Sequence, residues 1–370
     1  MVGESFQGKV GLEADAVAWD AFLSAHPSAT AYHFWSWRRV WDVFGHESLY
    51  LSAREGGALV GVLPVVGFRS RLFGRFLCSL PFVNYGGMIV GQQSTVDGPR
   101  STVHAPGSTV GSAAGDTAIA SALLAHAASL ARERGASHVE LRHVAAQLED
   151  APTRTHKVTM WLTLADGEEA QWKALDNKVR NQVRKAEKSA LTAATGGAEL
   201  LAEFYPVFAE TMRDLGTPVY PRRFFAAVAE ASGAAMRVHV VRQGSRPVAA
   251  GLTIDHPDRR EVPWAASLRD VRALCPNMLL YWQMLRDTIA SGHRVFDFGR
   301  STPGEGTYHF KKQWKAEAVP LHWEYALIGR DALPDQSPTN AKFHMAIEAW
   351  KRLPLPIANR LGPLVIGNIP

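Results

Sequence analysis

The sequence predicts an α/β (α+β) protein of two domains, each with a mixed sheet flanked by helices. The chain has 370 residues, which is enough for two domains of ordinary size. Hydrophobic residues make up 46% and charged residues 20%, a globular composition with ample core. Stretches of helical periodicity alternate with short strand-like stretches along the whole chain, as in folds that layer helices on sheets.

The first half is expected to combine strands with amphipathic helices. Its predicted helices are 14–26, a second that begins at Ser28 or Thr30 and runs to 44, and 116–134. Its predicted strands are 49–54, 58–68, 82–90, 138–144 and 157–164. Glycines at 86 and 87 interrupt the stretch 82–90, which suggests close approach of backbone or ligand. Residues 91–115 are rich in Gly, Ser, Thr and Pro and are predicted to form a surface loop.

The second half reads as helix, helix, three antiparallel strands, helix, strand, helix, strand. After a basic helix at 168–191, the predicted elements are helices 199–215 and 222–231, strands 236–242, 248–255 and 261–267, helix 277–290, strand 295–298, a closing segment 308–314 and strand 321–328. A helix at 340–351 and an apolar tail at 353–370 follow, and the tail either packs on the body or touches a partner or membrane surface. We therefore expect domains at 1–165 and 166–330, followed by a helix and Pro-rich tail at 331–370.

The stretch from Asn277 to Trp314 is the most informative part of the chain. Its helix ends at Ser291-Gly292, and the strand Val295–Phe298 then runs into the polar sequence Gly299-Arg300-Ser301. A glycine-rich loop at the carboxyl end of a buried strand is a common way to build a small-molecule site.

Three segments of the second half resemble the carboxyl half of FemAB-like proteins in order and spacing. They are Tyr281-Trp282, the sequence DFGRS at 297–301 and the sequence GTYHFK at 306–311; the basic sequence KVRNQVRKA at 178–186 is similar to the helix that opens the second domain of that family. The resemblance is nearest to the subgroup found beside exopolysaccharide and PEP-CTERM sorting systems. It implies two tandem GNAT-like (acyl-CoA N-acyltransferase) domains, of which the first is a degenerate copy.

The resemblance implies the role of Lys311, and the chemistry and position of the neighbouring residues indicate the others. Lys311, in the family's Phe-Lys motif, is tied to activity through a tRNA end or a developing negative charge. Asp297 acts as a base or orients Arg300, or is a buried structural carboxylate; Tyr308 donates a hydrogen bond to a carbonyl oxygen, or is a core aromatic residue. The candidate substrate-binding residues are Arg300, Ser301 and Phe310 near the strand end, Tyr85 and Gly86 in the first domain, and Lys178, Arg180 and Arg184 on the basic helix, whose alternative interpretation is a solvated charged face.

The acyl donor stays open between aminoacyl-tRNA and acyl-CoA. Acyl-CoA enzymes of the GNAT fold hold pyrophosphate at a glycine-rich helix start, whereas the stretch 268–277 has no glycine and Pro276 removes one N–H donor. Peptidyl-transferring relatives often carry a coiled-coil arm for tRNA, and no heptad insertion is present here. No bound cofactor and no metal are expected, since the histidines lack metal-ligand spacing and Cys78 and Cys275 read as small core residues.

Charge and targeting signals narrow the function further. The net charge of +5 and pI of about 9.2 favour anionic partners such as nucleotide-linked sugars, tRNA or an anionic membrane face, without choosing among them. The absence of a signal peptide and of an apolar run near the roughly 18 residues of a membrane span predicts a cytoplasmic protein, with peripheral contact at the inner membrane left open. We expect an N-acyltransferase acting on an amine of a cell-envelope or exopolysaccharide precursor, with a lipid- or nucleotide-linked glycan as substrate and no DNA partner. The alternative is a non-catalytic GNAT-fold binding or assembly protein.

Overall fold

The computed structural model describes residues 6–70, 73–91, 114–148, 150–334 and 341–369. The chain forms two compact units, one of residues 1–159, 319–335 and 368–370 and one of residues 160–318 and 336–367. Both units are discontinuous in sequence because two strands, β7 (Thr153–Thr163) and β13 (Glu317–Leu327), pass from one unit into the other.

The first unit is built on a mixed sheet with the strand order β1-β2-β3-β4-β6-β13. Only the β4–β6 pair is parallel in this order, and the short β5 pairs with β3. The strands are β1 Lys9–Leu12, β2 Glu47–Glu55, β3 Ala58–Ser70, β4 Gly74–Ser79, β5 Ile89–Val90 and β6 His138–His143.

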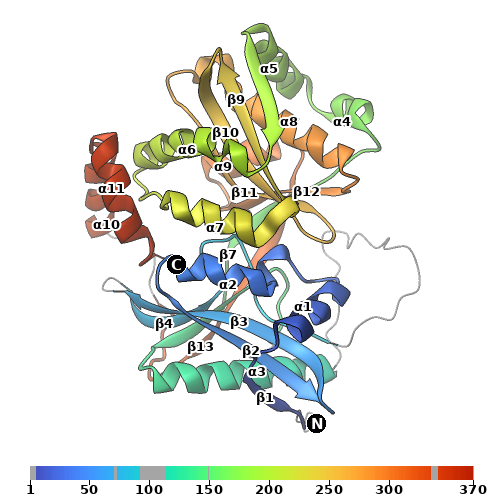
Figure 1. Ribbon diagram of the computed structural model, residues 1–370, viewed down its shortest axis with the longest axis vertical. Coiled ribbons are helices and arrows are strands. Elements are labelled where there is room, and N and C mark those ends of the chain that lie inside the picture. The colour runs from blue at the N-terminus through green and yellow to red at the C-terminus, as the bar shows by residue number, and fades with distance from the viewer. Residues whose placement is uncertain (1–5, 71–72, 92–113, 149, 335–340, 370) are drawn as a thin grey trace. The chain divides into compact units, whose positions relative to one another are not determined.

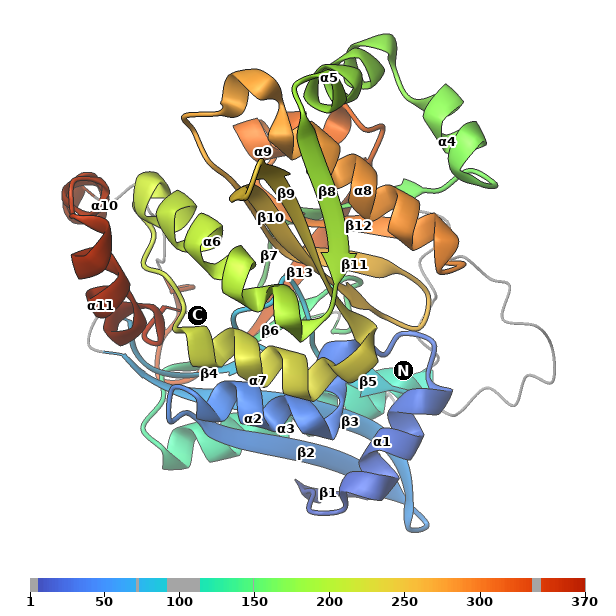
Figure 2. The ribbon, with the colours of Figure 1, turned by 45° about the horizontal axis from the view of Figure 1, so that its top comes forward.

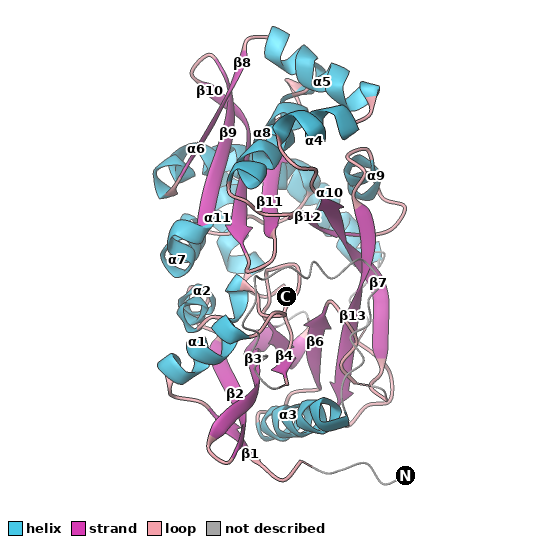
Figure 3. Ribbon diagram, turned by 90° about the vertical axis from the view of Figure 1, so that its right-hand side faces the viewer, coloured by secondary structure: helices cyan, strands magenta, loops and turns pink. Residues whose placement is uncertain are grey.

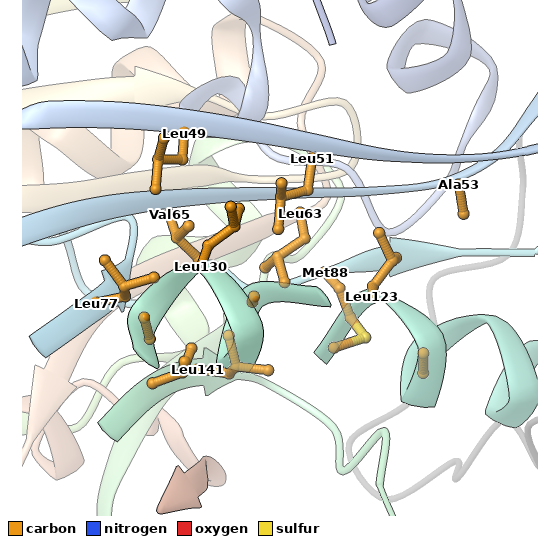
Figure 4. Packing of buried hydrophobic residues seen from close by; sticks show 14 of the residues in the cluster. Leu49, Leu51, Ala53, Leu63, Val65, Leu77, Met88, Leu123, Leu130 and Leu141 are labelled. Carbon is orange, nitrogen blue, oxygen red and sulfur yellow. The ribbon is translucent and has the colours of Figure 1, made fainter. Parts of the chain in front are cut away.

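Alternating side chains of β2 belong to two separate hydrophobic clusters. Leu49 and Leu51 point toward Leu123 and Leu130 of helix α3 (Ala114–Glu133), as Figure 4 shows. Tyr50, between them in sequence, belongs to a second cluster under helix α1 (Ala16–Ala25). This period of two is what places apolar side chains on both faces of a strand covered by helices.

Two predictions for the first half are wrong, and two strands were missed. Residues 82–90 are a buried, irregular segment that ends in the two-residue β5, because Leu80 (φ 41°) and Phe82 (φ 69°) turn the chain out of the extended conformation. The helix expected up to residue 44 is two 3₁₀ turns and the short α2, Arg38–Asp42. Strands β1 and β4 were not predicted at all. Most of the predicted loop at 91–115 lies outside the described residues.

The second unit contains the strand order β12-β11-β10-β9-β8, with the end of β7 beside β12. β11 and β12 are parallel and the other pairs along this order are antiparallel. The strands are β8 Leu191–Gly196, β9 Met236–Gln243, β10 Arg246–Asp255, β11 Arg260–Ser267 and β12 Val295–Ser301. Helices α6 and α8 cover opposite faces of these strands (Figures 1 and 2).

The helices of the second unit largely match the prediction. They are α4 Glu168–Ala174, α5 Asn177–Lys188, α6 Leu201–Leu215, α7 Arg222–Ser232, α8 Pro276–Ala290, α9 Gly306–Lys312, α10 Ala341–Lys351 and α11 Leu355–Ile366, and Figure 3 colours them cyan. The helix predicted at 168–191 is wrong as a single element, since Leu175 and Asp176 are extended and separate α4 from α5. The apolar tail contains helix α11. None of the helices in the described ranges is long and apolar enough to span a bilayer.

Candidate active site

The candidate site lies where β11 and β12 run in parallel. The two strands pair only at Arg260↔Phe296 and Glu261↔Asp297. Beyond these positions β12 bends at Gly299, whose φ of 74° is in the left-handed region that glycine adopts without strain. The carboxyl end of β12 therefore carries backbone groups that do not continue the ladder with β11.

Asp297 is buried and fixes this bend. Its Oδ1 accepts a hydrogen bond from the backbone N–H of Gly299 at 2.7 Å, and its Oδ2 accepts one from Trp161 Nε1 at 2.9 Å. Arg259 Nε lies 3.9 Å from the same Oδ2. Both carboxylate oxygens are thus engaged by the protein itself, as a buried carboxylate requires.

Lys311 reaches back from α9 to the bend. Its Nζ donates to the carbonyl oxygens of Gly299 at 2.8 Å and Arg300 at 2.9 Å. Successive carbonyls of a regular strand point to opposite sides, so the left-handed Gly299 explains how one ammonium reaches both. The side chain is 7% exposed, and this burial lowers the pKa of Lys311 to about 8, although the carboxylates of Asp297 and Glu261 act in the opposite direction.

A second buried carboxylate, Glu261, faces Asp297 across the parallel pair. His256 Nε2 donates to Glu261 Oε2 at 2.6 Å, and burial together with Arg259 lowers the pKa of His256 to about 3, so the imidazole is neutral. Sequence reasoning missed Glu261, His256, Arg259 and Trp161. The available signal was the ionisable Glu261 within a strand that was otherwise predicted to be apolar.

Aromatic side chains surround the Lys311 end of the site. Tyr281 stacks on Phe298, with ring centroids 5.4 Å apart, and meets Phe310 edge-on at 5.0 Å. Trp314 packs beside them and also lines a pocket of about 400 Å³ between the end of β7, helix α4 and the segment after α9. Its buried Nε1 has no hydrogen-bond partner among the described residues.

The other residues predicted for the second domain divide into two groups. Arg300 is half-buried and Ser301 is buried at the strand end, where the Ser301 hydroxyl has no partner within the described part of the chain. Tyr308 is half-buried on α9, with Lys312 Nζ 5.7 Å from its ring centroid.

The basic residues lie on α5, which packs on α8. Lys178 and Arg184 are exposed, and Arg184 lies over the ring of Trp172 at 5.4 Å. Arg180 donates to the carbonyl of Lys173 and to the side chain of Asn177. Two of the three predicted cations therefore face solvent.

The first unit contains a corresponding parallel pair. Cys78 on β4 lies opposite Glu140 on β6, and Arg142 binds Glu140 through Nε and Nη2, both at 2.7 Å. Tyr325 donates to the other Glu140 oxygen at 3.1 Å, and Trp323 covers the guanidinium at 4.5 Å. All of these side chains are buried.

The predicted first-domain residues Tyr85 and Gly86 are near this pair. Tyr85 is buried with Trp323 and Tyr325. Gly86 donates its N–H to the Arg142 carbonyl at 2.8 Å and accepts from the Ser79 hydroxyl at 2.7 Å. A Cβ at Gly86 would lie 2.3 Å from Leu80, so the close approach predicted from the glycine is between two parts of the chain.

The glycine-free turn before α8 has one left-handed residue, Cys275, with φ 60°. Pro276 is the first residue of α8, a position where its missing N–H breaks no helix hydrogen bond but removes one donor from the helix start. Within the described ranges, no three His, Cys, Asp or Glu side chains are grouped so that they could hold a metal ion.

Comparison with known proteins finds one matching domain family and several similar solved structures. Residues 173–312 match the family model described as an acetyltransferase (GNAT) domain. No curated protein sequence matches the chain. Among solved structures, FemX is similar with a TM-score of 0.60 at 13% identity, covering 85% of this chain and 96% of FemX.

Two further structures are similar over most of their length. L-PGS from Bacillus licheniformis has a TM-score of 0.52 at 12% identity, and the match covers 93% of this chain and 100% of the L-PGS chain. The C-terminal domain of a candidate lysylphosphatidylglycerol synthetase from Agrobacterium fabrum has a TM-score of 0.53 at 10% identity, with coverages of 85% and 91%. The chain thus has a mixed α/β fold, and residues 173–312 of its second half match a GNAT acetyltransferase domain.

Proposed function

We propose that this protein is a FemAB-like N-acyltransferase that moves an acyl or aminoacyl group to an amine on a cell-envelope or exopolysaccharide precursor. The observation that carries the proposal is Lys311. A lysine that is 7% exposed and whose pKa is lowered to about 8 is unusual for a purely structural residue, and such perturbed groups concentrate at functional sites.

In the proposed reaction, the acceptor amine attacks the acyl carbonyl carbon and a C–N bond forms. The carbonyl oxygen then carries the negative charge of the tetrahedral intermediate. The Lys311 ammonium has three N–H donors, of which two hold Gly299 and Arg300, so the third is available to this oxygen. A fixed donor in a buried site stabilises an oxyanion at little cost in reorganisation.

Asp297 and Gly299 have positioning roles in this mechanism. Both Asp297 oxygens accept hydrogen bonds from the protein, which favours a structural carboxylate over a general base. When the intermediate collapses, the bond between the acyl carbon and the donor breaks. The proton released by the amine goes to the leaving thiolate or ribose oxygen of the donor.

The charge of the second unit suggests where the donor or acceptor phosphates bind. Lys178, Arg184, Lys185 and Lys188 are exposed on α5, and phosphate groups are their natural partners. Ser301 and Arg300 at the end of β12 are proposed to contact the substrate nearer the reacting carbon. A polyanionic donor, aminoacyl-tRNA or acyl-CoA, fits this surface, and the names of the two synthetase-like neighbours make a lipid-linked acceptor a reasonable first choice.

A thermal-shift screen of the purified protein tests the donor first, since a ligand that binds only the native state raises the melting temperature. The ligands are acetyl-CoA, longer acyl-CoAs, aminoacyl-tRNA and UDP-sugars. A shift with acyl-CoA makes the protein a CoA-dependent acyltransferase despite its glycine-free turn, whereas a shift with aminoacyl-tRNA places it with the peptidyl-transferring enzymes.

The stabilising donor is then used in a transfer assay with an amine acceptor. Lys311→Ala should lose turnover and keep donor binding, and Lys173→Ala, an exposed lysine paired with Glu169, serves as the matched control. If the unmodified protein binds the donor but shows no turnover, the enzyme hypothesis is wrong and the alternative, a non-catalytic binding or assembly protein, takes its place.

A further inference from the structure

Exposed apolar side chains concentrate at one end of the second unit. Seven large apolar side chains are exposed in the described part of the chain, and four of them lie on α10 and α11: Met345 (73%), Ile357 (47%), Leu361 (40%) and Leu364 (71%). A fifth, Leu215, ends α6, the helix on which both α10 and α11 pack (Figure 2). Such clustering marks an interaction surface, whereas single exposed apolar residues do not.

Helix α11 is apolar on two faces. Ala358, Gly362 and Ile366 form the buried face, and the absence of a Cβ at Gly362 lets the helix approach Val219, whose backbone N would lie 2.8 Å from such an atom. Ile357, Leu361 and Leu364 follow the spacing i, i+4, i+7 and form a second stripe, which faces solvent. The first face already attaches α11 to the unit, so the stripe is not needed for that contact. A helix that is apolar on both sides is normally covered on both.

The charge around the stripe is positive. Over residues 345–366, whose side chains the structure describes, the chain holds Lys351, Arg352 and Arg360 against the single acid Glu348, a net charge of 3 − 1 = +2. Glu348 is bound by Lys351 at 2.6 Å. Arg352 and Arg360 are exposed, and Arg360 lies within α11 next to Leu361.

We propose that α10 and α11 dock on an anionic phospholipid surface, with the Ile357, Leu361 and Leu364 stripe in the acyl boundary and Arg352 and Arg360 at the lipid phosphates. An apolar stripe bordered by Arg and Lys is the pattern of a helix that lies in a membrane interface. A stable protein interface uses roughly 20–30 residues on each side, far more than the few side chains of this patch. The inference does not depend on the transfer activity, because it concerns other residues and its test needs no substrate.

Sedimentation of the full chain with vesicles tests the proposal. The expected result is binding to vesicles of phosphatidylcholine mixed with phosphatidylglycerol, and at least about tenfold weaker binding to pure phosphatidylcholine. The triple variant Ile357→Ser/Leu361→Ser/Leu364→Ser should weaken binding to the anionic vesicles by about tenfold or more, because its apolar insertion is lost. Arg352→Gln/Arg360→Gln should weaken it with a smaller dependence on salt.

A matched control removes exposed apolar side chains elsewhere. Leu12→Ser/Val17→Ser, in the first unit, replaces two exposed apolar residues and should bind vesicles like the unmodified protein. Equal loss in this control, or full binding by the triple variant, would overturn the proposal. So would a dimer in sedimentation velocity that becomes a monomer in the triple variant, since the stripe would then be covered by a second copy.

Discussion

In the first unit the parallel strands β4 and β6 bring Cys78 opposite Glu140, and in the second β11 and β12 bring Glu261 opposite Asp297. In each unit three successive antiparallel strands are followed by a helix and a returning strand, apart from the two-residue β5 in the first unit, and the returning strand pairs with the third. Two positions beyond the buried carboxylate the units differ. The first has Arg142, which binds Glu140 directly, and the second has Gly299, which bends the strand.

As a consequence, the cation at the centre of each unit has its pKa shifted in a different direction. Burial disfavours the charge of Arg142, but Cys78 and Glu140 outweigh burial and raise the pKa of its guanidinium, so this centre holds a permanent ion pair. In the second unit the cation comes from α9, and Lys311 has its pKa lowered to about 8. A buried pair whose two charges satisfy each other is typical of a structural core, whereas a buried lysine with a lowered pKa is available for chemistry.

The largest expected effect is the loss of Arg142. Arg142→Ala leaves Glu140 buried without its partner, and breaking a buried pair in this way costs about 3–5 kcal/mol. Urea denaturation measures this cost as a lower free energy of unfolding. Glu140→Leu/Arg142→Met, which replaces both partners by apolar side chains, should recover most of it. A loss below about 1 kcal/mol in Arg142→Ala would mean that the pair is not structural.

Lys311→Ala should instead reduce transfer about 10²–10³-fold, the range seen when one oxyanion donor is removed. The measurement is kcat/KM with the donor found by thermal shift, beside Lys173→Ala as the control. A change within about threefold would place Lys311 with Arg142 as a structural cation.

The two centres should also differ in their effect on stability against pH. Lys311 has a folded pKa of about 8, below the ordinary 10.5 that applies when unfolded, so between these values the unfolded chain binds more protons. Its contribution is therefore complete above pH 10.5 and is lost as the pH falls through 8, a span of about 3 kcal/mol. The difference in unfolding free energy between the unmodified protein and Lys311→Met, measured from pH 7.5 to 10.5, should show this slope. An identical pH dependence in both proteins would contradict it.

The smallest effect concerns the bend. Gly299→Ala forces an L side chain to φ 74°, which costs about 1–2 kcal/mol, and turns the two carbonyls away from Lys311. Gly11→Ala is the control, since Gly11 has no neighbouring atoms within 4 Å of an added Cβ and no left-handed φ. Thermal denaturation should separate the two variants. Equal melting temperatures would show that the bend does not need glycine.

Much of the second unit was predictable from sequence because its signals are local. Helical periodicity, the glycine after α8 and the alternating strands predicted the order of elements except for β8, and the family resemblance pointed to Lys311. The partners of these residues were not predictable. Glu261 and Asp297 are 36 positions apart in sequence and lie opposite each other only because of the register of β11 and β12. Trp161, which donates to Asp297, lies on β7.

The first unit was less predictable for a related reason. Leu80 and Phe82 adopt left-handed φ values, which no local sequence pattern predicts. Residues 82–90 were therefore predicted to be a strand. Arg142 and Glu140 lie on one strand two positions apart and could have been noticed as a charged pair within an alternating apolar run. Trp323 and Tyr325, which complete that centre, are about 180 residues away on β13.

The most direct test of the account is the pKa of Lys311 itself. The Cε resonance of Lys311, in protein labelled with ¹³C-lysine and assigned by its absence in Lys311→Arg, can be followed against pH by NMR. A midpoint near 8 is expected, well below the ordinary lysine value of 10.5. A midpoint near the ordinary value of 10.5 would contradict this expectation, because Lys311 would then be an unperturbed ammonium despite its burial.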